Sequence, residues 1–303
     1  MTIGLVAVDS VNYPNLALMK LSASHKAKGD LVEWYNPFNQ YDIVYLSKVF
    51  SFTPDYQIIT NASVVIKGGS GYALNGAGGE SYNPCADQPL PHDIEHIYPD
   101  YDLYGIKDTA YGRLTIGCPR NCRFCIVGKK EGLHCRKVAD LSEFWREQKN
   151  IVLFDSNLLA CQDWKELCMQ LYESKAWVDF NQGLDARLLT PSKCEVLSSL
   201  KMKKIHFAWD NYEDKDMIVP KLKMFANHSK LAGTHNAIVY VLVNYNSTLD
   251  QDLERIYILR ELGFWAYVMI YDKAHCAKVY RHLQRWCNNR AVFAKVPFFK
   301  YYA

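Results

Sequence analysis

The feature that most constrains the fold of this chain is the regular alternation of strand-like and helix-like segments from residue 113 onwards. Apolar runs rich in β-branched residues are separated by segments whose apolar residues recur at helical spacing. Strands that alternate with helices favour a parallel sheet with right-handed crossovers. The expected strands span residues 113–117, 150–155, 178–183, 204–210, 237–244 and 265–272. The expected helices span about 140–148, 162–174, 191–199, 213–228, 250–261 and 275–287.

Six strand–helix repeats predict a partial (β/α)6 TIM-like barrel, two repeats short of a closed eightfold barrel. Pro191, Asp250 and Glu254 support the helix starts, since proline and acidic residues are favoured in the first helical turn. We expect the partial barrel to span residues 113–290 and an apolar, aromatic tail to follow over 291–303.

Residues 1–71 predict a smaller α/β domain with a Rossmann-like parallel sheet. Short apolar runs at 3–9, 42–47 and 63–69 are typical of strands, and residues 15–27 carry apolar side chains at helical spacing. The overall fold class is therefore α/β, with two parallel arrangements in succession.

Residues 72–112 differ from both flanking segments in composition. They are rich in Gly, Pro, Asn, Asp and Tyr, which favours irregular structure over a packed element. We expect an inter-domain linker there.

Composition bounds the class of protein and its compartment. The N-terminal sequence MTIGLVAVDS has no basic leader, and no run approaches 18 apolar residues, so we expect neither a signal peptide nor a membrane span. Ten cysteines in such a chain are expected to be reduced thiols and metal ligands in a cytoplasmic setting. The net charge of +3 argues neither for nor against a nucleic-acid surface, because a local patch can hide in a balanced total.

The cysteine motif is the strongest chemical signal. Cys118, Cys122 and Cys125 have the spacing C-x3-C-x2-C on a loop directly after the first expected barrel strand. Three thiolates that converge on one cuboidal iron–sulfur cluster leave the fourth iron without a protein ligand, and such an open position is what chemistry requires. In β/α barrels, reactive groups gather on loops at the carboxyl ends of the strands.

A zinc site is the alternative for these cysteines, with His134 or Cys135 as the fourth ligand. Zinc sites favour paired C-x2-C units, so this spacing suits zinc less well. The remaining cysteines are scattered, and Cys161 and Cys168 are typical of small core residues.

The motif and its position resemble the radical S-adenosylmethionine (radical SAM) superfamily. Phe124, before the last cysteine, matches the aromatic residue that usually stands there. The resemblance covers about residues 113–275. It implies that a [4Fe–4S] cluster binds S-adenosylmethionine at its open iron and cleaves it reductively, giving a 5′-deoxyadenosyl radical that abstracts a hydrogen atom from the substrate.

The whole chain is similar to uncharacterised radical SAM proteins with an N-terminal domain like a cobalamin-binding domain. The D-x-H-x-x-G motif that supplies a cobalt-ligating histidine is absent, since LVEWYNPF follows Asp30, so cobalamin is not expected. Methylthiotransferases carry three further N-terminal cysteines, whereas only Cys85 precedes Cys118 here. Sulfur insertion by that route is therefore not expected. The similarity is carried by YPNLALMKLSASHKAKGD, IGCPRNCRFCIVGKKEG, NQGLDARLL and VLVNYNSTLDQDLERIYILRELG.

The resemblance also nominates polar residues after the second and third strands. Asp155 stands, with Asn157, where the family places a motif for the methionine amino group, and the alternative for Asp155 is a helix cap. Arg187 is a candidate for gripping the methionine carboxylate, while Gln182 and Asp185 are candidates for the ribose hydroxyls. A structural Asp185–Arg187 pair is the competing interpretation.

Two further candidates follow the fourth and fifth strands. Asp210 is a candidate for ribose or substrate and the neighbouring Trp209 for stacking, with a helix cap and an aromatic wall as alternatives. Asn244 lies at the level where the family supports adenine.

We therefore expect hydrogen abstraction from an unidentified small-molecule or peptide substrate, with flavodoxin or ferredoxin as the electron donor. Modification of a nucleoside in RNA or DNA is an alternative, and a zinc-stabilised binding module is another. The nucleic-acid alternative draws on the basic residues Arg120, Arg123, Lys129, Lys130, Arg136 and Lys137, which can equally be a solvated loop.

Overall fold

The computed structural model describes residues 1–10, 13–74, 81–234 and 236–302. Two compact units are distinguished by their internal contacts. The first unit comprises Met1–Gly112, Arg120–Leu133 and Ala139–Gln148. The second unit comprises Arg113–Pro119, His134–Val138 and Lys149–Ala303.

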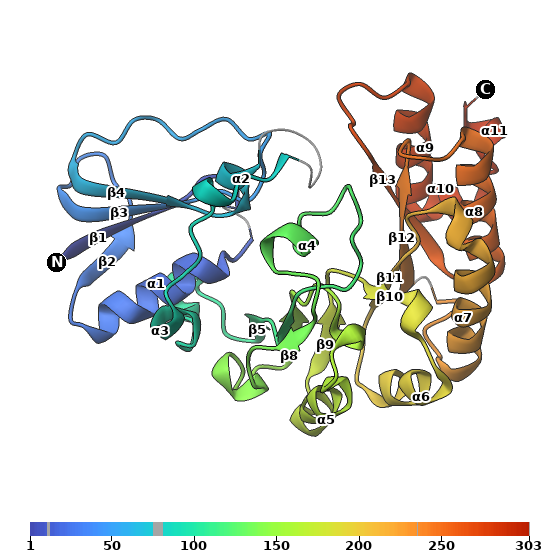
Figure 1. Ribbon diagram of the computed structural model, residues 1–303, viewed down its shortest axis with the longest axis horizontal. Coiled ribbons are helices and arrows are strands. Elements are labelled where there is room, and N and C mark those ends of the chain that lie inside the picture. Colours follow the sequence, from blue (N-terminus) through green and yellow to red (C-terminus); the bar gives the residue numbers. More distant parts are fainter. Residues whose placement is uncertain (11–12, 75–80, 235, 303) are drawn as a thin grey trace. The chain divides into compact units, whose positions relative to one another are not determined.

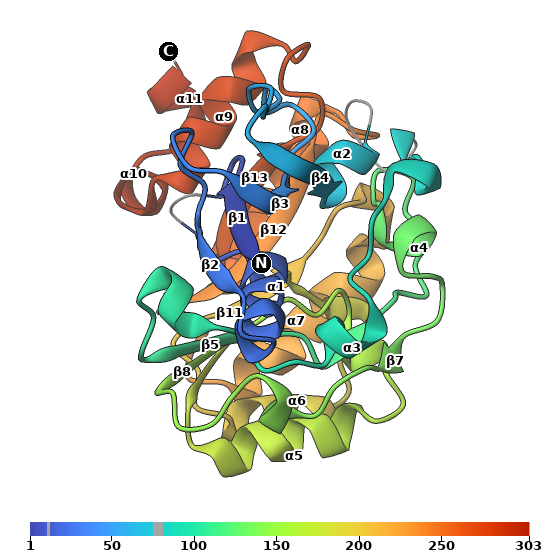
Figure 2. The same ribbon diagram turned by 90° about the vertical axis from the view of Figure 1, so that its left-hand side faces the viewer.

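The first unit is built on a four-stranded parallel sheet (Figures 1 and 2). The strands lie in the order β2-β1-β3-β4, and every neighbouring pair is parallel. The expected parallel sheet is therefore confirmed. Strand β2 was not expected, because its four residues are half-buried or exposed and show no apolar run. The strand bounds are Thr2–Ala7 for β1, Leu31–Trp34 for β2, Tyr41–Ser47 for β3 and Ala62–Gly68 for β4.

Helix α1 (Leu16–Ala27) packs against one face of this sheet (Figure 1). Its N-cap is Asn15, whose side-chain oxygen accepts from the backbone N–H of Leu18. Leu18 and Leu21 of the helix form a buried cluster with Ile3 and Leu5 of β1. Burial of these aliphatic side chains fixes the helix on the sheet.

The remainder of the first unit consists of short elements. The segment expected to be a linker holds several of them, and its residues 75–80 lie outside the described part. The expected helix over 140–148 is wrong: only a 3-10 turn forms, and the backbone N–H of Arg146 bonds to the side chain of Gln148 instead of to a helical carbonyl. The elements are α2 (Ser70–Ala73), η2 (Pro84–Ala86), α3 (His92–Glu95), η3 (Tyr101–Tyr104), β5 (Thr109–Gly112), α4 (Val127–Lys130) and η4 (Leu141–Glu143).

The second unit contains the other strands. Its largest sheet has the parallel order β10-β11-β12-β13, and β8 and β9 are parallel neighbours in another sheet. Strands β6 and β7 form a short antiparallel pair. The bounds are Thr115–Ile116 for β6, Arg136–Lys137 for β7, Asn150–Leu153 for β8, Trp177–Phe180 for β9, Leu184–Asp185 for β10, Ile205–Ala208 for β11, Ala237–Val243 for β12 and Trp265–Ile270 for β13.

Apart from the short antiparallel pair of β6 and β7, the paired strands of this unit are parallel, as expected, but they do not join into one barrel within the described residues. Between β9 and the four-stranded sheet the ladder is reduced to an isolated parallel bridge between Val178 and Met202. What the structure shows is thus an α/β fold with parallel sheets.

Helices cover one face of the four-stranded sheet (Figure 1). Phe207 of β11 lies edge-on to Phe225 of α7, with ring centroids 5.0 Å apart, and also contacts the ring of Phe264. At the C-terminus, Phe298 packs on Trp286 at 5.4 Å, so the aromatic tail folds back onto α9. No described helix has both the length and the apolar character needed to cross a lipid bilayer. The helical segments are η5 (Leu158–Ala160), α5 (Trp164–Ser174), η6 (Ala186–Leu188), α6 (Pro191–Ser199), η7 (Tyr212–Asp214), α7 (Lys215–His228), α8 (Leu249–Glu261), α9 (Lys278–Asn288), α10 (Arg290–Lys295) and α11 (Phe298–Tyr302).

Candidate functional site

The three motif cysteines follow strand β6 directly. Gly117 adopts a φ of 87° at the start of the loop, a conformation that glycine tolerates far better than other residues. Cys118, Cys122 and Cys125 form no disulfide, and each has intermediate exposure. Cys118 belongs to the second unit, and the other two belong to the first.

Asn157 contacts the first of these cysteines. Its side-chain Nδ2 donates to Cys118 Sγ at 3.3 Å, and the residue is only 3% exposed. Its other polar atom, Oδ1, is buried and has no hydrogen-bond partner within the described residues. A buried acceptor without a donor is costly, because the group has lost its hydration. Asn157 therefore has a side-chain acceptor without a donor next to the sulfur of Cys118.

Asp155 holds the strand that leads into the cysteine loop. Its carboxylate accepts from the backbone N–H groups of Leu114 and Thr115 and from the Thr115 hydroxyl. Burial raises the pKa of Asp155 to about 6, against the lowering effect of the Thr115 hydroxyl and the two backbone donors. The carboxylate oxygens are thus engaged within the chain. The structure does not show Asp155 as a helix cap: Asn157 is the N-cap of the following 3-10 turn.

Cys135 lies behind the same loop. Its thiol donates to the backbone carbonyl of Asn157 at 3.2 Å, and burial raises the pKa of the Cys135 thiol to about 12. His134 is exposed. Over the described residues, no three His, Cys, Asp or Glu side chains are gathered as a metal site.

Arg187 is engaged by carboxylates on two sides. Its Nε donates to Asp185 Oδ1 at 2.7 Å, and its Nη1 donates to Asp214 Oδ2 at 2.9 Å. Asp185 also accepts from the backbone N–H of Arg187 as the cap of η6. The structure therefore shows the structural Asp185–Arg187 pair, while Gln182 is exposed.

Asp210 lies near the charged side chains of Asp185, Arg187 and Asp214. Burial raises the pKa of Asp210 to about 6; Arg255 and Arg187 oppose the shift, and Asp185 and Asp214 add to it. The expectation that Trp209 stacks on a ligand is wrong, because Trp209 is fully buried and its indole N–H donates to the carbonyl of Asn211.

Asn244 joins the carboxyl ends of two strands. It adopts a φ of 60°, in the left-handed region, and its Nδ2 donates to the carbonyl of Tyr271 after β13. Its backbone N–H donates to Asp252 Oδ2 at 3.4 Å. The Asn244 side chain therefore connects the segments that follow β12 and β13.

A buried ion pair organises these strand ends and was not foreseen from the sequence. Arg255 of α8 donates to Asp252 and to the backbone carbonyls of Trp209, Asp210 and Leu242. Arg255 and Asp252 are both fully buried. The signal available in the sequence was an Asp and an Arg three residues apart on one helix, a pattern that exposed surface pairs share.

Comparison with known proteins adds no family assignment. A scan against protein-family models finds no match, and no curated protein is similar to this chain.

Proposed function

We propose that this chain is a radical SAM enzyme that holds a 4Fe–4S cluster on Cys118, Cys122 and Cys125. The observation that carries the proposal is the pairing of Cys118 with Asn157. One side-chain amide gives an N–H to the cysteine sulfur and keeps a buried oxygen without a donor. Hydrogen bonds from N–H groups to ligating sulfur are a general way in which proteins tune iron–sulfur clusters.

The donor set fits this group. Three half-buried thiols on a loop that follows a strand supply soft ligands and leave one iron open. With the cluster bound, the chemistry supplied is one-electron reduction of the sulfonium of S-adenosylmethionine, which breaks a C–S bond into methionine and a 5′-deoxyadenosyl radical. An electron donor such as flavodoxin or ferredoxin would provide the electron.

In this proposal, residues of the chain itself bind S-adenosylmethionine and orient the cysteine loop. With S-adenosylmethionine bound, Asn157 Oδ1 would be the acceptor for its ammonium group once the loop gives the ligand access to this buried oxygen. Asp155 fixes the backbone of residues 114 and 115, and through it the start of the cysteine loop. In this proposal the parallel strands of the second unit form a partial barrel whose interior keeps water from the radical. The substrate is an unidentified small molecule or peptide.

A zinc-stabilised binding module fits the structure less well. Cys135, one of the two candidate fourth ligands, is buried, its thiol donates to a carbonyl, and its pKa is raised to about 12. A zinc ligand must be a thiolate, so this environment opposes the role.

Anaerobic reconstitution with iron and sulfide tests the proposal. We expect about four irons and four sulfides per chain, and formation of 5′-deoxyadenosine from S-adenosylmethionine under reducing conditions. Replacement of Cys118, Cys122 or Cys125 by Ala should abolish that product, whereas Cys161→Ala should retain it because Cys161 is a buried core residue. Asn157→Leu should keep the iron and raise the KM for S-adenosylmethionine by roughly tenfold or more, since the ammonium loses an acceptor. Stoichiometric zinc without cleavage, or full activity of the Cys122→Ala variant, would refute the assignment.

A further inference from the structure

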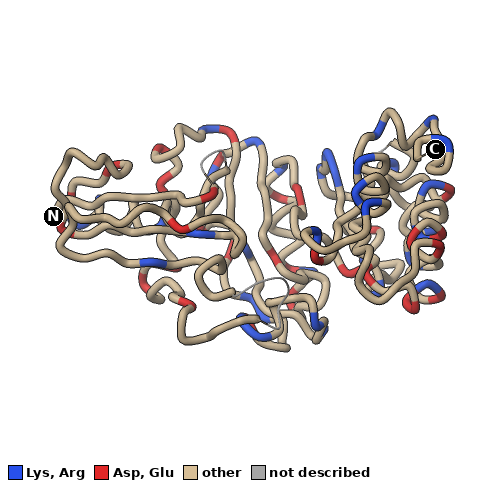
Figure 3. Tube along the Cα trace, turned by 90° about the horizontal axis from the view of Figure 1, so that it is seen from above, with Lys and Arg blue, Asp and Glu red and all other residues tan. Residues whose placement is uncertain are grey.

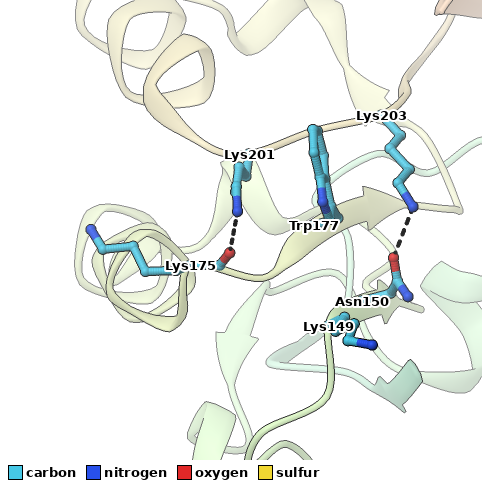
Figure 4. A pocket seen from close by; sticks show the side chains of 6 residues that line it. All are labelled: Lys149, Asn150, Lys175, Trp177, Lys201 and Lys203. Atoms are coloured by element: carbon cyan, nitrogen blue, oxygen red, sulfur yellow. Dashed lines mark hydrogen bonds between the residues drawn. The ribbon is translucent and has the colours of Figure 1, made fainter. Parts of the chain in front are cut away.

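The second unit contains a cavity of about 310 Å³ that is unrelated to the cysteine loop. We call it the lysine–tryptophan pocket. It lies where strands begin: Asn150 and Trp177 are the first residues of β8 and β9, and Lys201 and Lys203 precede β11. The residues that line it are Lys149, Asn150, Lys175, Trp177, Lys201 and Lys203 (Figure 4).

The strand ladder brings these residues together from distant parts of the sequence. Asn150 and Trp177 are partners in the register of β8 and β9. The backbone N–H of Trp177 donates to the carbonyl of Lys149 at 2.8 Å, and the N–H of Val178 donates to the carbonyl of Lys201 at 2.7 Å. Lysines that precede β8, β9 and β11 thereby line one pocket with Trp177.

The pocket is positively charged. Four of its six lining residues are lysines and none is acidic. The Nζ of Lys201 donates to the backbone carbonyl of Lys175, and that of Lys203 donates to Asn150 Oδ1, each at 3.2 Å. These acceptors are neutral, so they leave the two charges uncompensated. Figure 3 shows Lys and Arg, and Asp and Glu, distributed along the whole trace.

Trp177 supplies an accessible aromatic surface next to Lys201 and Lys203. It is 37% exposed, and the ammonium groups of Lys201 and Lys203 lie 5.4 and 5.5 Å from its ring centroid. Figure 4 shows the indole standing between these two lysines, while the Lys175 side chain points away from it. Flexible lysines can leave the ring faces for an anion, and each face is then open to a planar ring.

We propose that the lysine–tryptophan pocket binds single-stranded nucleic acid, with backbone phosphates on Lys149, Lys201 and Lys203 and a base stacked on Trp177. A basic groove with an aromatic platform is the general solution for binding unpaired strands, because phosphates provide the charge and every base has a π-face. The cavity has the volume of a small-ligand pocket, enough for one nucleotide unit. A duplex keeps its bases stacked and cannot offer one to this indole.

The pocket lies at the strand ends opposite to those that carry Cys118 and Asn157. Cys118 follows β6 and Asn157 follows β8 at their carboxyl ends, whereas the pocket lies at the amino ends of β8 and β9. Binding there requires neither iron nor S-adenosylmethionine.

Fluorescence anisotropy with a labelled oligo-dT or oligo-U of about 12 nucleotides tests this on the full chain without iron or S-adenosylmethionine. Three phosphate contacts predict a slope of about −2 for the logarithm of the association constant against that of the salt concentration. The Lys201→Gln/Lys203→Gln variant should reduce the magnitude of the slope by about 1.4. Lys223→Gln/Lys230→Gln, exposed lysines of the α7 region, removes the same charge and should leave the slope unchanged.

The stacking contact is tested separately. Trp177→Leu should weaken binding by roughly tenfold with little change in the salt slope, and Trp177→Phe should recover most of the affinity. Unfolding curves of each variant confirm that it is folded.

Three results would overturn the proposal. These are no binding at low salt, equal binding by the pocket and control lysine variants, or affinity for a duplex or polyglutamate equal to that for the oligonucleotide. Because the assay contains no iron, failure to detect 5′-deoxyadenosine in the enzyme experiment leaves its outcome interpretable.

Discussion

Two buried aspartates at the strand ends reach a similar pKa in different surroundings. Asp155 accepts three hydrogen bonds from Leu114 and Thr115, yet burial still raises its pKa to about 6. Asp210 is shifted to about 6 by burial in a mixed field of two arginines and two carboxylates. For both side chains, loss of hydration outweighs the favourable partners.

The raised pKa of Asp210 predicts a pH dependence of stability. In the unfolded chain the carboxyl group loses its proton near pH 3.8, but in the folded chain it does so near pH 6. Between these values the folded state binds more protons, so the free energy of unfolding falls as pH rises and then levels off. Asp210→Asn should remove about 1–3 kcal/mol of that fall, measured by urea denaturation at pH 4.5 and 7.

Asp216→Asn is the matched control, because Asp216 lies on the first turn of α7. It should leave the profile between pH 4 and 6 close to that of the parent protein. A parent profile that rises throughout this range, or one that Asp210→Asn does not alter, contradicts the prediction.

At the residue scale, the positions of candidate site residues were easier to predict from the sequence than their hydrogen-bond partners. The spacing of Cys118, Cys122 and Cys125 is local, so it can be read directly from the chain. The contact of Asn157 with Cys118 joins residues that are 39 positions apart, so no local pattern predicts it. The lack of a donor for Asn157 Oδ1 likewise depends on the folded structure. For the same reason the hydrogen bonds of Asp155 to Leu114 and Thr115 could not be predicted from the sequence.

Elements with strong local signals were predicted well. Helix α6 matches the expected 191–199, because Thr190 caps the first turn and Pro191 occupies its first position. Residues 140–148 carried a helical apolar pattern as well, but the side-chain oxygen of Gln148 accepts from the backbone N–H of Arg146 there. A local bond between a side chain and the backbone thus outweighs the helix propensity of that segment.

At the scale of elements, the buried ion pair between Asp252 and Arg255 of α8 leads to a prediction about the stability of the fold. Arg255→Leu removes the donors to three backbone carbonyls and leaves Asp252 buried without its cation. We expect a loss of about 3–5 kcal/mol in the free energy of unfolding, measured by chemical denaturation.

The double variant Asp252→Leu/Arg255→Leu completes a thermodynamic cycle. It should be clearly less destabilised than the sum of the two single variants, because neither charge is left alone. Additive single effects would mean that the two side chains stabilise α8 independently. Lys223→Leu, at an exposed position of α7, gives the background effect of adding a leucine to a helix.

For the whole molecule, parallel pairing was predictable and sheet closure was not. Alternating strands and helices dictate parallel neighbours, which both large sheets show. Continuity between β9 and the four-stranded sheet depends on pairing over a few residues, where only Val178 and Met202 form a bridge. The compact units are also discontinuous in sequence, so composition shifts along the chain do not mark them.

The discontinuity of the first unit predicts that a fragment ending at Gly112 is incomplete. Phe144 is 3% exposed and its ring lies against Gly112, where an added Cβ would come within 2.3 Å of it. The Tyr101 hydroxyl also donates to the Phe144 carbonyl at 2.6 Å. Fragment 1–148 should therefore unfold with a free energy about 3 kcal/mol or more above that of fragment 1–112, measured in urea. Phe144→Ala in the longer fragment should remove most of the gain, whereas equal stability of the two fragments would show that the first 112 residues fold without these contacts.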